Sequence, residues 1–198
     1  MIIRAVINAL LGDGHIDRRP SRKQHGLIWM STCREWLEWK QQNLIPTSLK
    51  SQIYIHREAN SKSCFANSKT LYGLRTQYSN QINKYSSWSK QEALCASDLL
   101  DLAIWFLDDG CTISRRTDSP GSYRVTLCVG DITADDLFPE ASRILGLRPT
   151  SLGRVYKNNS RATERNKSWI MTKAAAVQIM REARNIAPPD LQYKVPLW

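Results

Sequence analysis

Two stretches of this sequence, residues 6–14 (VINALLGDG) and residues 102–110 (LAIWFLDDG), repeat one pattern: an apolar run that ends in Asp-Gly. Their aspartates, Asp13 and Asp109, are separated by close to half of the 198 residues. An apolar run of about ten residues makes about three turns of helix. The repeat therefore predicts two similar halves, each of which delivers one carboxylate from the end of a helix to a shared centre.

The paired aspartates favour a metal-dependent reaction. Two carboxylates side by side repel each other and resist joint ionisation unless a cation lies between them. Mg²⁺ takes oxygen ligands and keeps several waters, and a metal-bridged pair of acids suits in-line attack on a phosphodiester. A single Asp-Gly commonly does no more than end a helix, because glycine adopts the left-handed conformation without a Cβ penalty. Two copies at half-chain spacing favour the catalytic interpretation.

The two stretches also resemble a known motif. Residues 102–110 are similar to the LAGLIDADG motif, with Leu-Ala at the start and Asp-Asp-Gly at the end, and residues 6–14 resemble a more diverged copy. Residues 189–194 (PDLQYK) resemble the terminal Tyr-Lys segment of one branch of that family. Over nearly its whole length, the chain resembles a LAGLIDADG homing endonuclease of the single-chain, two-repeat (pseudo-symmetric monomer) type.

The resemblance implies an α+β fold of two pseudo-symmetric αββαββα halves. Each half would contain a four-stranded antiparallel sheet, and the two sheets would form a DNA-binding saddle. The hydrophobic periodicity gives the same element order. We expect an N-terminal LAGLIDADG repeat at 1–85, a polar linker at 86–92 and a C-terminal LAGLIDADG repeat at 93–198.

The two halves are expected to contain similar elements. In the first half, the pattern predicts helices at 3–12, 34–44 and 70–85 and strands at 15–18, 26–31, 51–57 and 64–68. In the second half, it predicts helices from 93 or 97 to 108, at 134–145 and at 173–184, and strands at 111–115, 123–129, 151–156 and 168–171. Thr133 is the expected N-cap of the helix at 134–145, and Gly146 is expected to end that helix.

The composition favours a nucleic-acid partner. Lys and Arg number 28 against 18 Asp and Glu, and the resulting formal charge of +10 favours a polyanion. The five cysteines contain no C-x-x-C pair, which argues against zinc, and their odd number without a secretory leader indicates reduced thiols inside a cell. No apolar stretch reaches the length of about twenty residues that a membrane span needs. We expect an intracellular protein, whose origin in bacterial cytoplasm, phage or organelle the sequence does not distinguish.

The resemblance assigns a metal site to the two motifs. It implies that Asp13 and Asp109 are catalytic and bind the cations, with backbone carbonyls of Gly12 and Asp108 as further donors. The implied cofactor is Mg²⁺, with Mn²⁺ or Ca²⁺ as substitutes.

Two lysines are the candidates for a basic residue near each acid. Lys90 and Lys194 each follow the last predicted helix of a half, and the resemblance implies that they polarise water or stabilise the transition state. The alternative is that both lysines only position phosphates or lie on the surface.

The polar, basic strands and their loops are expected to bind DNA. Antiparallel ribbons fit the major groove with alternate side chains toward the bases, while Lys and Arg also contact phosphates. The sequence does not separate the residues that read bases from those that contact phosphates. The candidate residues are Arg18, Arg19, Arg22, Lys23, Arg57, Lys62, Arg115, Arg116, Arg124, Arg154, Lys157, Arg161 and Arg165.

We therefore expect a monomeric, site-specific DNA endonuclease that makes a metal-dependent double-strand break in a long asymmetric target. Its expected partners are double-stranded DNA and host intron RNA, with no membrane. Two alternatives use the same fold: an intron RNA maturase and a DNA-binding regulator that does not cleave. A third is a generic basic RNA-binding protein with fortuitous repeats. The presence of both Asp13 and Asp109 argues against a degenerate binder.

Overall fold

The chain divides into two compact units, Met1–Ser89 (unit 1) and Lys90–Trp198 (unit 2), each built around a sheet of its own. A computed structural model describes residues 2–19, 22–59, 69–114, 123–157 and 167–196. The division lies inside the segment 86–92, whose last three residues begin a helix. In these described ranges, no helix is long and apolar enough to cross a membrane.

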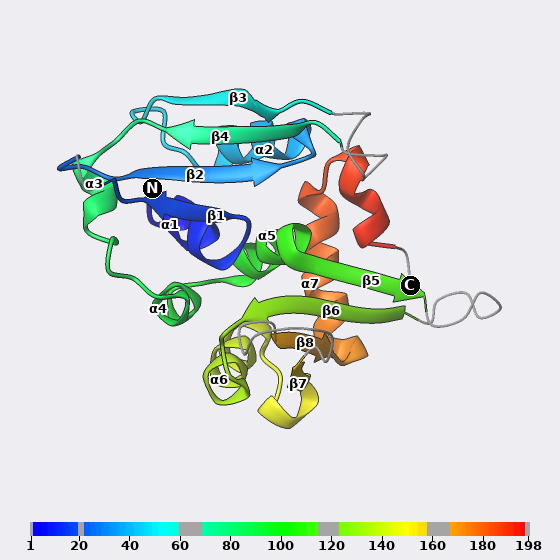
Figure 1. The fold of residues 1–198 in the computed structure, drawn as a ribbon. Coiled ribbons are helices and arrows are strands. Elements are labelled where there is room, and N and C mark those ends of the chain that lie inside the picture. Colours follow the sequence, from blue (N-terminus) through cyan, green and yellow to red (C-terminus); the bar gives the residue numbers. More distant parts are fainter. Residues whose placement is uncertain (1, 20–21, 60–68, 115–122, 158–166, 197–198) are drawn as a thin grey trace. The chain divides into compact units, whose positions relative to one another are not determined.

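Unit 1 contains a four-stranded antiparallel sheet with its strands in the order β1-β2-β4-β3. Helices α1 and α2 pack against this sheet (Figure 1). In chain order, the elements are α1 (Ile2–Leu11), β1 (Gly14–Asp17), β2 (Gly26–Ser31), α2 (Arg34–Asn43), β3 (Ser51–Arg57), β4 (Leu71–Thr76) and α3 (Asn80–Asn83).

Alternation along the strands gives this sheet one apolar face and one polar face. Trp29 of β2 and Leu74 of β4 are register partners, and both are fully buried. Since successive side chains point to opposite faces, the adjacent partners Ile28 and Arg75 lie on the other face, which we call the open face of unit 1.

Unit 2 repeats the topology, with its antiparallel strands in the order β5-β6-β8-β7. It has an additional short helix, α4, before the motif helix in the chain, and two short 3₁₀ helices, η1 and η2 (Figure 1). In chain order, the elements are α4 (Lys90–Cys95), α5 (Leu99–Asp109), β5 (Gly110–Ser114), β6 (Tyr123–Gly130), α6 (Ala134–Leu145), η1 (Pro149–Ser151), β7 (Gly153–Lys157), β8 (Lys167–Met171), α7 (Lys173–Ile186) and η2 (Pro189–Lys194). The predicted α+β class and the αββαββα order are confirmed in both units.

Side-chain caps set the ends of the helices in unit 2. At the start of α5, Asp98 N donates to Asp101 Oδ2 at 3.1 Å and Asp101 N donates to Asp98 Oδ1 at 3.0 Å, which is a capping box. This box separates α5 from α4, so the motif helix begins later than predicted. The Thr133 cap of α6 and the left-handed Gly146 after it, with φ 63°, are confirmed.

One predicted element of unit 1 is wrong. Residues 70–85 were expected to form a helix, but they contain strand β4 and the four-residue helix α3. Leu71, Leu74, Tyr78 and Ile82 do lie at helical spacing, yet residues 71–76 pair with β2 on one side and β3 on the other. These long-range ladders outweigh the local pattern. The strand predicted at 64–68 lies outside the described residues.

Candidate active site and nucleic-acid interface

In unit 1, the first motif aspartate follows its helix by two residues. Helix α1 ends at Leu11, and Gly12 N still donates to Asn8 O at 3.2 Å. Asp13 is exposed, and its carbonyl accepts a hydrogen bond from Met30 N at 3.3 Å. The backbone of Asp13 is thereby joined to β2 just before β1 begins, which fixes the position from which its carboxylate projects.

In unit 2, the second motif aspartate is the last residue of its helix. Helix α5 continues to Asp109, which is half-buried, and Gly110 N donates to Phe106 O to close the final turn. Strand β5 begins at Gly110 without an intervening loop. In both units, the motif aspartate directly precedes the first residue of a strand.

The glycine after each aspartate is required by close packing, and the expected reason, a left-handed conformation, is wrong. Gly110 has φ −84°, and Gly14 does not have a positive φ. A Cβ at Gly14 would lie 2.6 Å from Trp29 Cδ1 and 2.8 Å from Ala9 Cα, and one at Gly110 would overlap the side chain and carbonyl oxygen of Phe106. Each Asp-Gly therefore marks the point where the strand crosses its own helix with no room for a side chain.

Lys194 lies at the C-terminal end of α5. Its Nζ donates to Leu107 O at 2.7 Å and to Asp108 O at 3.0 Å, one residue before Asp109. The last carbonyls of a helix have no partner within the helix and carry partial negative charge, so an ammonium group there is favourable. The Asp108 carbonyl, expected as a metal donor, accepts a hydrogen bond from this lysine.

Lys90 has a different setting, although it was expected to be the counterpart of Lys194. It is the first residue of α4, in the same unit, and its Nζ lies 5.9 Å from the ring centroid of Trp105. Trp105 is buried in α5, one turn before Asp109. Lys90 thus contacts the middle of the motif helix, whereas Lys194 contacts its end.

The open face of unit 1 carries a row of three polar side chains and one isoleucine across the sheet. The register places His15, Ile28, Arg75 and Gln52 side by side on β1, β2, β4 and β3. The guanidinium carbon of Arg75 lies 5.7 Å from the ring centroid of Tyr54, within cation–π range. Sequence reasoning missed Arg75 because it placed this residue in a helix, and only the pairing of its strand with β2 and β3 identifies its face.

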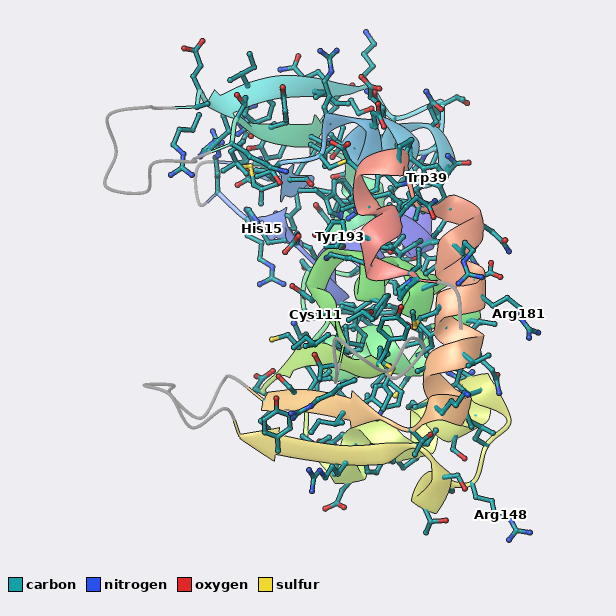
Figure 2. The ribbon with its side chains drawn as sticks, turned by 90° about the vertical axis from the view of Figure 1, so that its right-hand side faces the viewer. His15, Trp39, Cys111, Arg148, Arg181 and Tyr193 are labelled. Atoms are coloured by element: carbon teal, nitrogen blue, oxygen red, sulfur yellow. The ribbon has the colours of Figure 1, made fainter. Side chains whose placement is uncertain are left out.

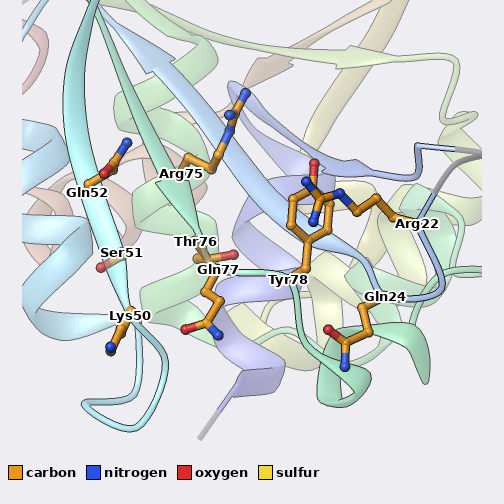
Figure 3. Close-up of a pocket in the computed structure, with 9 residues that line it drawn as sticks. All are labelled: Arg22, Gln24, Lys50, Ser51, Gln52, Arg75, Thr76, Gln77 and Tyr78. Atoms are coloured by element: carbon orange, nitrogen blue, oxygen red, sulfur yellow. The ribbon is translucent and has the colours of Figure 1, made fainter.

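An open groove of about 680 Å³ lies at one end of this face. Arg75 enters it from β4, Gln52 enters it from β3, and Arg22 lies beside the ring of Tyr78 (Figure 3). Three of the lining side chains are cationic, and most of the others are amides or hydroxyls. The lining residues are Arg22, Gln24, Lys50, Ser51, Gln52, Arg75, Thr76, Gln77 and Tyr78.

A carboxylate–tyrosine pair orders two arginines at the edge of this groove. The Tyr78 hydroxyl donates to Asp17 Oδ2 at 2.6 Å, and Arg19 Nε lies 3.2 Å from the same oxygen. The guanidinium carbon of Arg22 lies 4.9 Å from the Tyr78 ring centroid. Burial alone would raise the pKa of Asp17, but the hydrogen bond from Tyr78 and the charges of Arg19 and Arg75 outweigh it and hold that pKa below its usual value. Burial and the bond to Asp17 raise the pKa of Tyr78.

The sheet of unit 2 has a comparable polar face. Cys111, Thr126, Ile170 and Arg154 are register partners across β5, β6, β8 and β7, and Arg154 is exposed. On the same face, the guanidinium carbon of Arg124 lies 5.5 Å from the ring centroid of Tyr156. Each unit therefore places an arginine over a tyrosine on its polar face.

The expected DNA-binding residues divide into described and undescribed groups. Arg18, Lys23 and Arg57 are exposed at or beyond strand ends, and the Lys23 carbonyl accepts from Asn83 Nδ2 at 2.9 Å. Lys157 ends β7. Outside the described residues lie Lys62, Arg115, Arg116, Arg161 and Arg165.

No protein-family model matches this chain, and no curated protein matches it significantly. Solved structures do match: the homing endonuclease I-WcaI bound to its DNA recognition sequence has a TM-score of 0.71 at 13% identity, over 100% of this chain and 88% of that chain. Mesophilic variants of the homing endonuclease I-DmoI match with a TM-score of 0.55 at 13% identity, over 93% and 95%. This chain has the LAGLIDADG homing-endonuclease fold. The N-terminal LAGLIDADG domain of DUF199/WhiA shares it, with a TM-score of 0.53 at 9% identity over 98% and 86%.

The donors at the two motifs are suited to a hard divalent cation. Within the described residues, no group of three or more His, Cys, Asp or Glu side chains forms a cage for a metal. Mg²⁺ does not need such a cage, because it keeps several waters and is held by one or two carboxylates together with substrate phosphates. Asp13, exposed after α1, and Asp109, at the end of α5, offer one carboxylate from each unit.

Proposed function

We propose that this protein is a divalent-metal-dependent, site-specific DNA endonuclease that makes a double-strand break in a long asymmetric target. The observation that carries the proposal is the matched placement of Asp13 and Asp109, each at the junction between a motif helix and the first strand of its sheet. In the proposed reaction, one carboxylate serves each scissile phosphate, and this chain provides one from each unit.

The proposed metal site consists of the carboxylates of Asp13 and Asp109, with the carbonyls of Gly12 and Asp108 nearby. Bound Mg²⁺ or Mn²⁺ would activate water and stabilise negative charge on the leaving 3′ oxygen. One I-DmoI variant was crystallised with its target DNA in the presence of Mn²⁺, and another in the presence of Mg²⁺. These likenesses support the proposal of a metal, and the carboxylates of this chain supply suitable oxygen donors.

The protein's own side chains would bind and orient the DNA. The open face of unit 1 offers Arg75, Gln52 and the groove beside Arg22, and the polar face of unit 2 offers Arg124 and Arg154. Arginine forms bidentate hydrogen bonds with guanine, and glutamine forms them with adenine. These strands therefore have side chains that can read bases in a major groove. The net charge of +10 adds a sequence-independent attraction to phosphates.

Lys194 would place a positive charge next to the reacting phosphate. Its ammonium group is held at the end of α5, adjacent to Asp109. A preorganised donor of this kind stabilises charge that develops in a transition state and needs no rearrangement during the reaction. We also propose that Lys90, whose ammonium lies over the ring of Trp105, polarises water or stabilises the transition state, as the second candidate after Lys194.

A non-cleaving DNA-binding protein with the same fold is the second candidate, because a fold does not by itself determine an activity. The fold alone suits both functions, so the test separates binding from cleavage. The purified chain is incubated with DNA that flanks its own gene, with and without Mg²⁺, and both retention and strand breaks are measured. We expect Mg²⁺-dependent breaks at one site in both strands. Specific binding without any break would support the second candidate and overturn the first.

We also propose that the protein binds its DNA target as a monomer. Two unlike units supply readers for both halves of an asymmetric target, so no partner chain is needed. Light scattering of the DNA complex is expected to give one chain per duplex, and an obligate dimer would contradict this part of the proposal.

A further inference from the structure

The segment 187–196 of unit 2, which we call the C-terminal strap, has an ordered internal structure. Gln192 Nε2 donates to Ala187 O at 2.6 Å, Leu191 N donates to Pro188 O at 2.9 Å, and Val195 N donates to Gln192 O at 3.1 Å. Val195 is 2% exposed. These contacts make the strap a compact turn that packs its end into the unit, with Tyr193 exposed on its outer side (Figure 2).

Two side chains from other elements attach the strap at Lys194 and at the two residues that follow it. Thr112 of β5 donates from Oγ1 to Lys194 O at 2.6 Å. Arg184 of α7 donates from Nη2 to Pro196 O at 2.6 Å and to Val195 O at 3.2 Å. Three consecutive carbonyls, from residues 194 to 196, are therefore occupied by donors that belong to the body of unit 2.

The attachment determines where the ammonium group of Lys194 lies. A lysine side chain has about 2 kcal/mol of rotamer entropy, so holding its ammonium at one point is already costly. A freely moving backbone would add to this disorder. With the backbone held by Thr112 and Arg184, Nζ reaches Leu107 O and Asp108 O at the end of α5. The two anchors thereby fix a positive charge beside Asp109 although neither anchor contacts that residue in these bonds.

We infer that Thr112 and Arg184 are positioning residues, which hold Lys194 in register with Asp109 for the cleavage reaction. The inference rests on the proposed function and deepens it. Both residues act through the strap, so their loss is expected to lower the rate of the chemical step and to leave DNA affinity unchanged. A misplacement of about 1 Å can lower a rate by about a hundredfold, so the expected effect is measurable.

The first test compares matched variants by single-turnover cleavage and by equilibrium DNA binding. Thr112→Val removes the hydroxyl at constant volume, and Thr112→Ser retains it. Arg184→Ala removes the second anchor, and Arg181→Ala is its control, because Arg181 lies one turn earlier on α7, is exposed, and has the same charge (Figure 2). We expect Thr112→Val and Arg184→Ala to cleave about ten to a hundredfold more slowly. Thr112→Ser and Arg181→Ala should cleave like the wild type, and all four should bind DNA equally.

The second test is a double-variant cycle, which separates positioning from a general loss of structure. Lys194→Ala removes the positioned charge and is expected to lower the rate by about 10² to 10³. If Arg184 acts through Lys194, then adding Arg184→Ala to Lys194→Ala causes little further loss. Equal, independent losses in the double variant would overturn the inference, as would an Arg184→Ala rate equal to that of Arg181→Ala.

Hydrogen exchange of the strap makes failure of the inference distinguishable from failure of the proposed function. The amides of Ala187 and of residues 190–195 are expected to exchange faster in Thr112→Val and Arg184→Ala than in the wild type and Arg181→Ala, whether or not the protein cleaves DNA. Unchanged exchange overturns the inference and leaves the endonuclease standing. A wild type that cleaves no DNA overturns the proposed function, while faster exchange in the variants still supports the anchoring.

Discussion

Asp13 and Asp109 lie at the C-terminal ends of corresponding helices, but the two helices end differently. Helix α1 ends two residues before Asp13, which is exposed and joined to β2 through its backbone. Helix α5 continues through Asp109, and its last carbonyls accept hydrogen bonds from Lys194. The feature that the junctions share is a glycine at the start of a strand, packed so closely that a Cβ has no room. The Asp-Gly pair thus marks a crossing of helix and strand, while the surroundings of each acid differ.

The largest effect is expected from removing either acid. Asp13→Asn and Asp109→Asn each delete a proposed metal ligand, whose transition-state stabilisation of several kcal/mol corresponds to about a 10³-fold loss of double-strand cleavage. Folding and DNA binding should be largely retained. Strand-resolved cleavage assays check this: nicking of one strand by one variant would assign that strand to the remaining acid. Full cleavage by either variant would remove that aspartate from the mechanism.

The next largest effect is expected on folding stability, when the glycines at the two junctions are replaced. Gly110→Ala is expected to destabilise unit 2 by about 3 kcal/mol, because its Cβ would overlap the Phe106 carbonyl, which is part of the helix backbone. Gly14→Ala is expected to destabilise unit 1 by about 2 kcal/mol, because its Cβ would lie 2.6 Å from Trp29 Cδ1 and 2.8 Å from the backbone Cα of Ala9. Urea denaturation provides the measurement. Gly26→Ala is the control, because a Cβ there meets nothing closer than 3.4 Å. Equal stability of all three variants would contradict the packing explanation.

The two arginine–tyrosine pairs allow the polar faces of the units to be compared. Arg75→Ala and Arg124→Ala are each expected to act in one of two ways. Loss of a base contact costs about 1–3 kcal/mol at one base pair and relaxes specificity there, whereas loss of a phosphate contact flattens the log–log salt slope by about 0.9. Binding to substituted targets at several salt concentrations distinguishes them.

The control for the arginine comparison lies away from both polar faces. Arg34→Ala removes an exposed arginine of α2 that pairs with Glu38 at 2.9 Å, and it should change neither slope nor specificity. If Arg75→Ala and Arg124→Ala behave like Arg34→Ala, then the polar faces do not bind DNA. The same test applies to Arg154, which is exposed on β7.

The smallest effect concerns the acid sensitivity of unit 1. Because the folded pKa of Asp17 is below its unfolded value, its bonds stabilise the fold fully above about pH 4 to 5, and this contribution is lost as the pH falls through the folded pKa. Tyr78→Phe should therefore lower stability by about 1 kcal/mol at pH 7 and by less below pH 4. Thermal melts across this range test it, and a difference that stays constant with pH would contradict the role of Asp17.

The sequence predicted the parts of the fold that local chemistry determines. Strands 26–31 and 51–57 and helix 134–145 have the predicted bounds. The apolar run of the first strand, the alternation in the second, and the Thr133 cap and Gly146 of the helix are all local signals. Strand β4 was missed because its formation depends on pairing with two strands far away in the sequence.

The candidate site was predictable only as far as the motifs extend. The resemblance predicted Asp13, Asp109 and Lys194 as site residues, whereas Thr112 and Arg184 carry no local signature. Lys194 meets Leu107, Asp108 and Thr112 across 82 to 87 residues of chain, so only the folded structure brings them together. Arg75 was missed for the same reason as its strand.

We propose above all that Asp13 and Asp109 together hold the metal at the scissile phosphates. A crystal structure of the protein with its target DNA and Mn²⁺, with the ions located by anomalous scattering, tests that claim most directly. We expect ions in contact with the DNA backbone and about 2.1 Å from carboxylate oxygens of both aspartates, which is the distance typical of Mg²⁺. Ions bound elsewhere, or DNA bound with both aspartates remote from its phosphates, would contradict it.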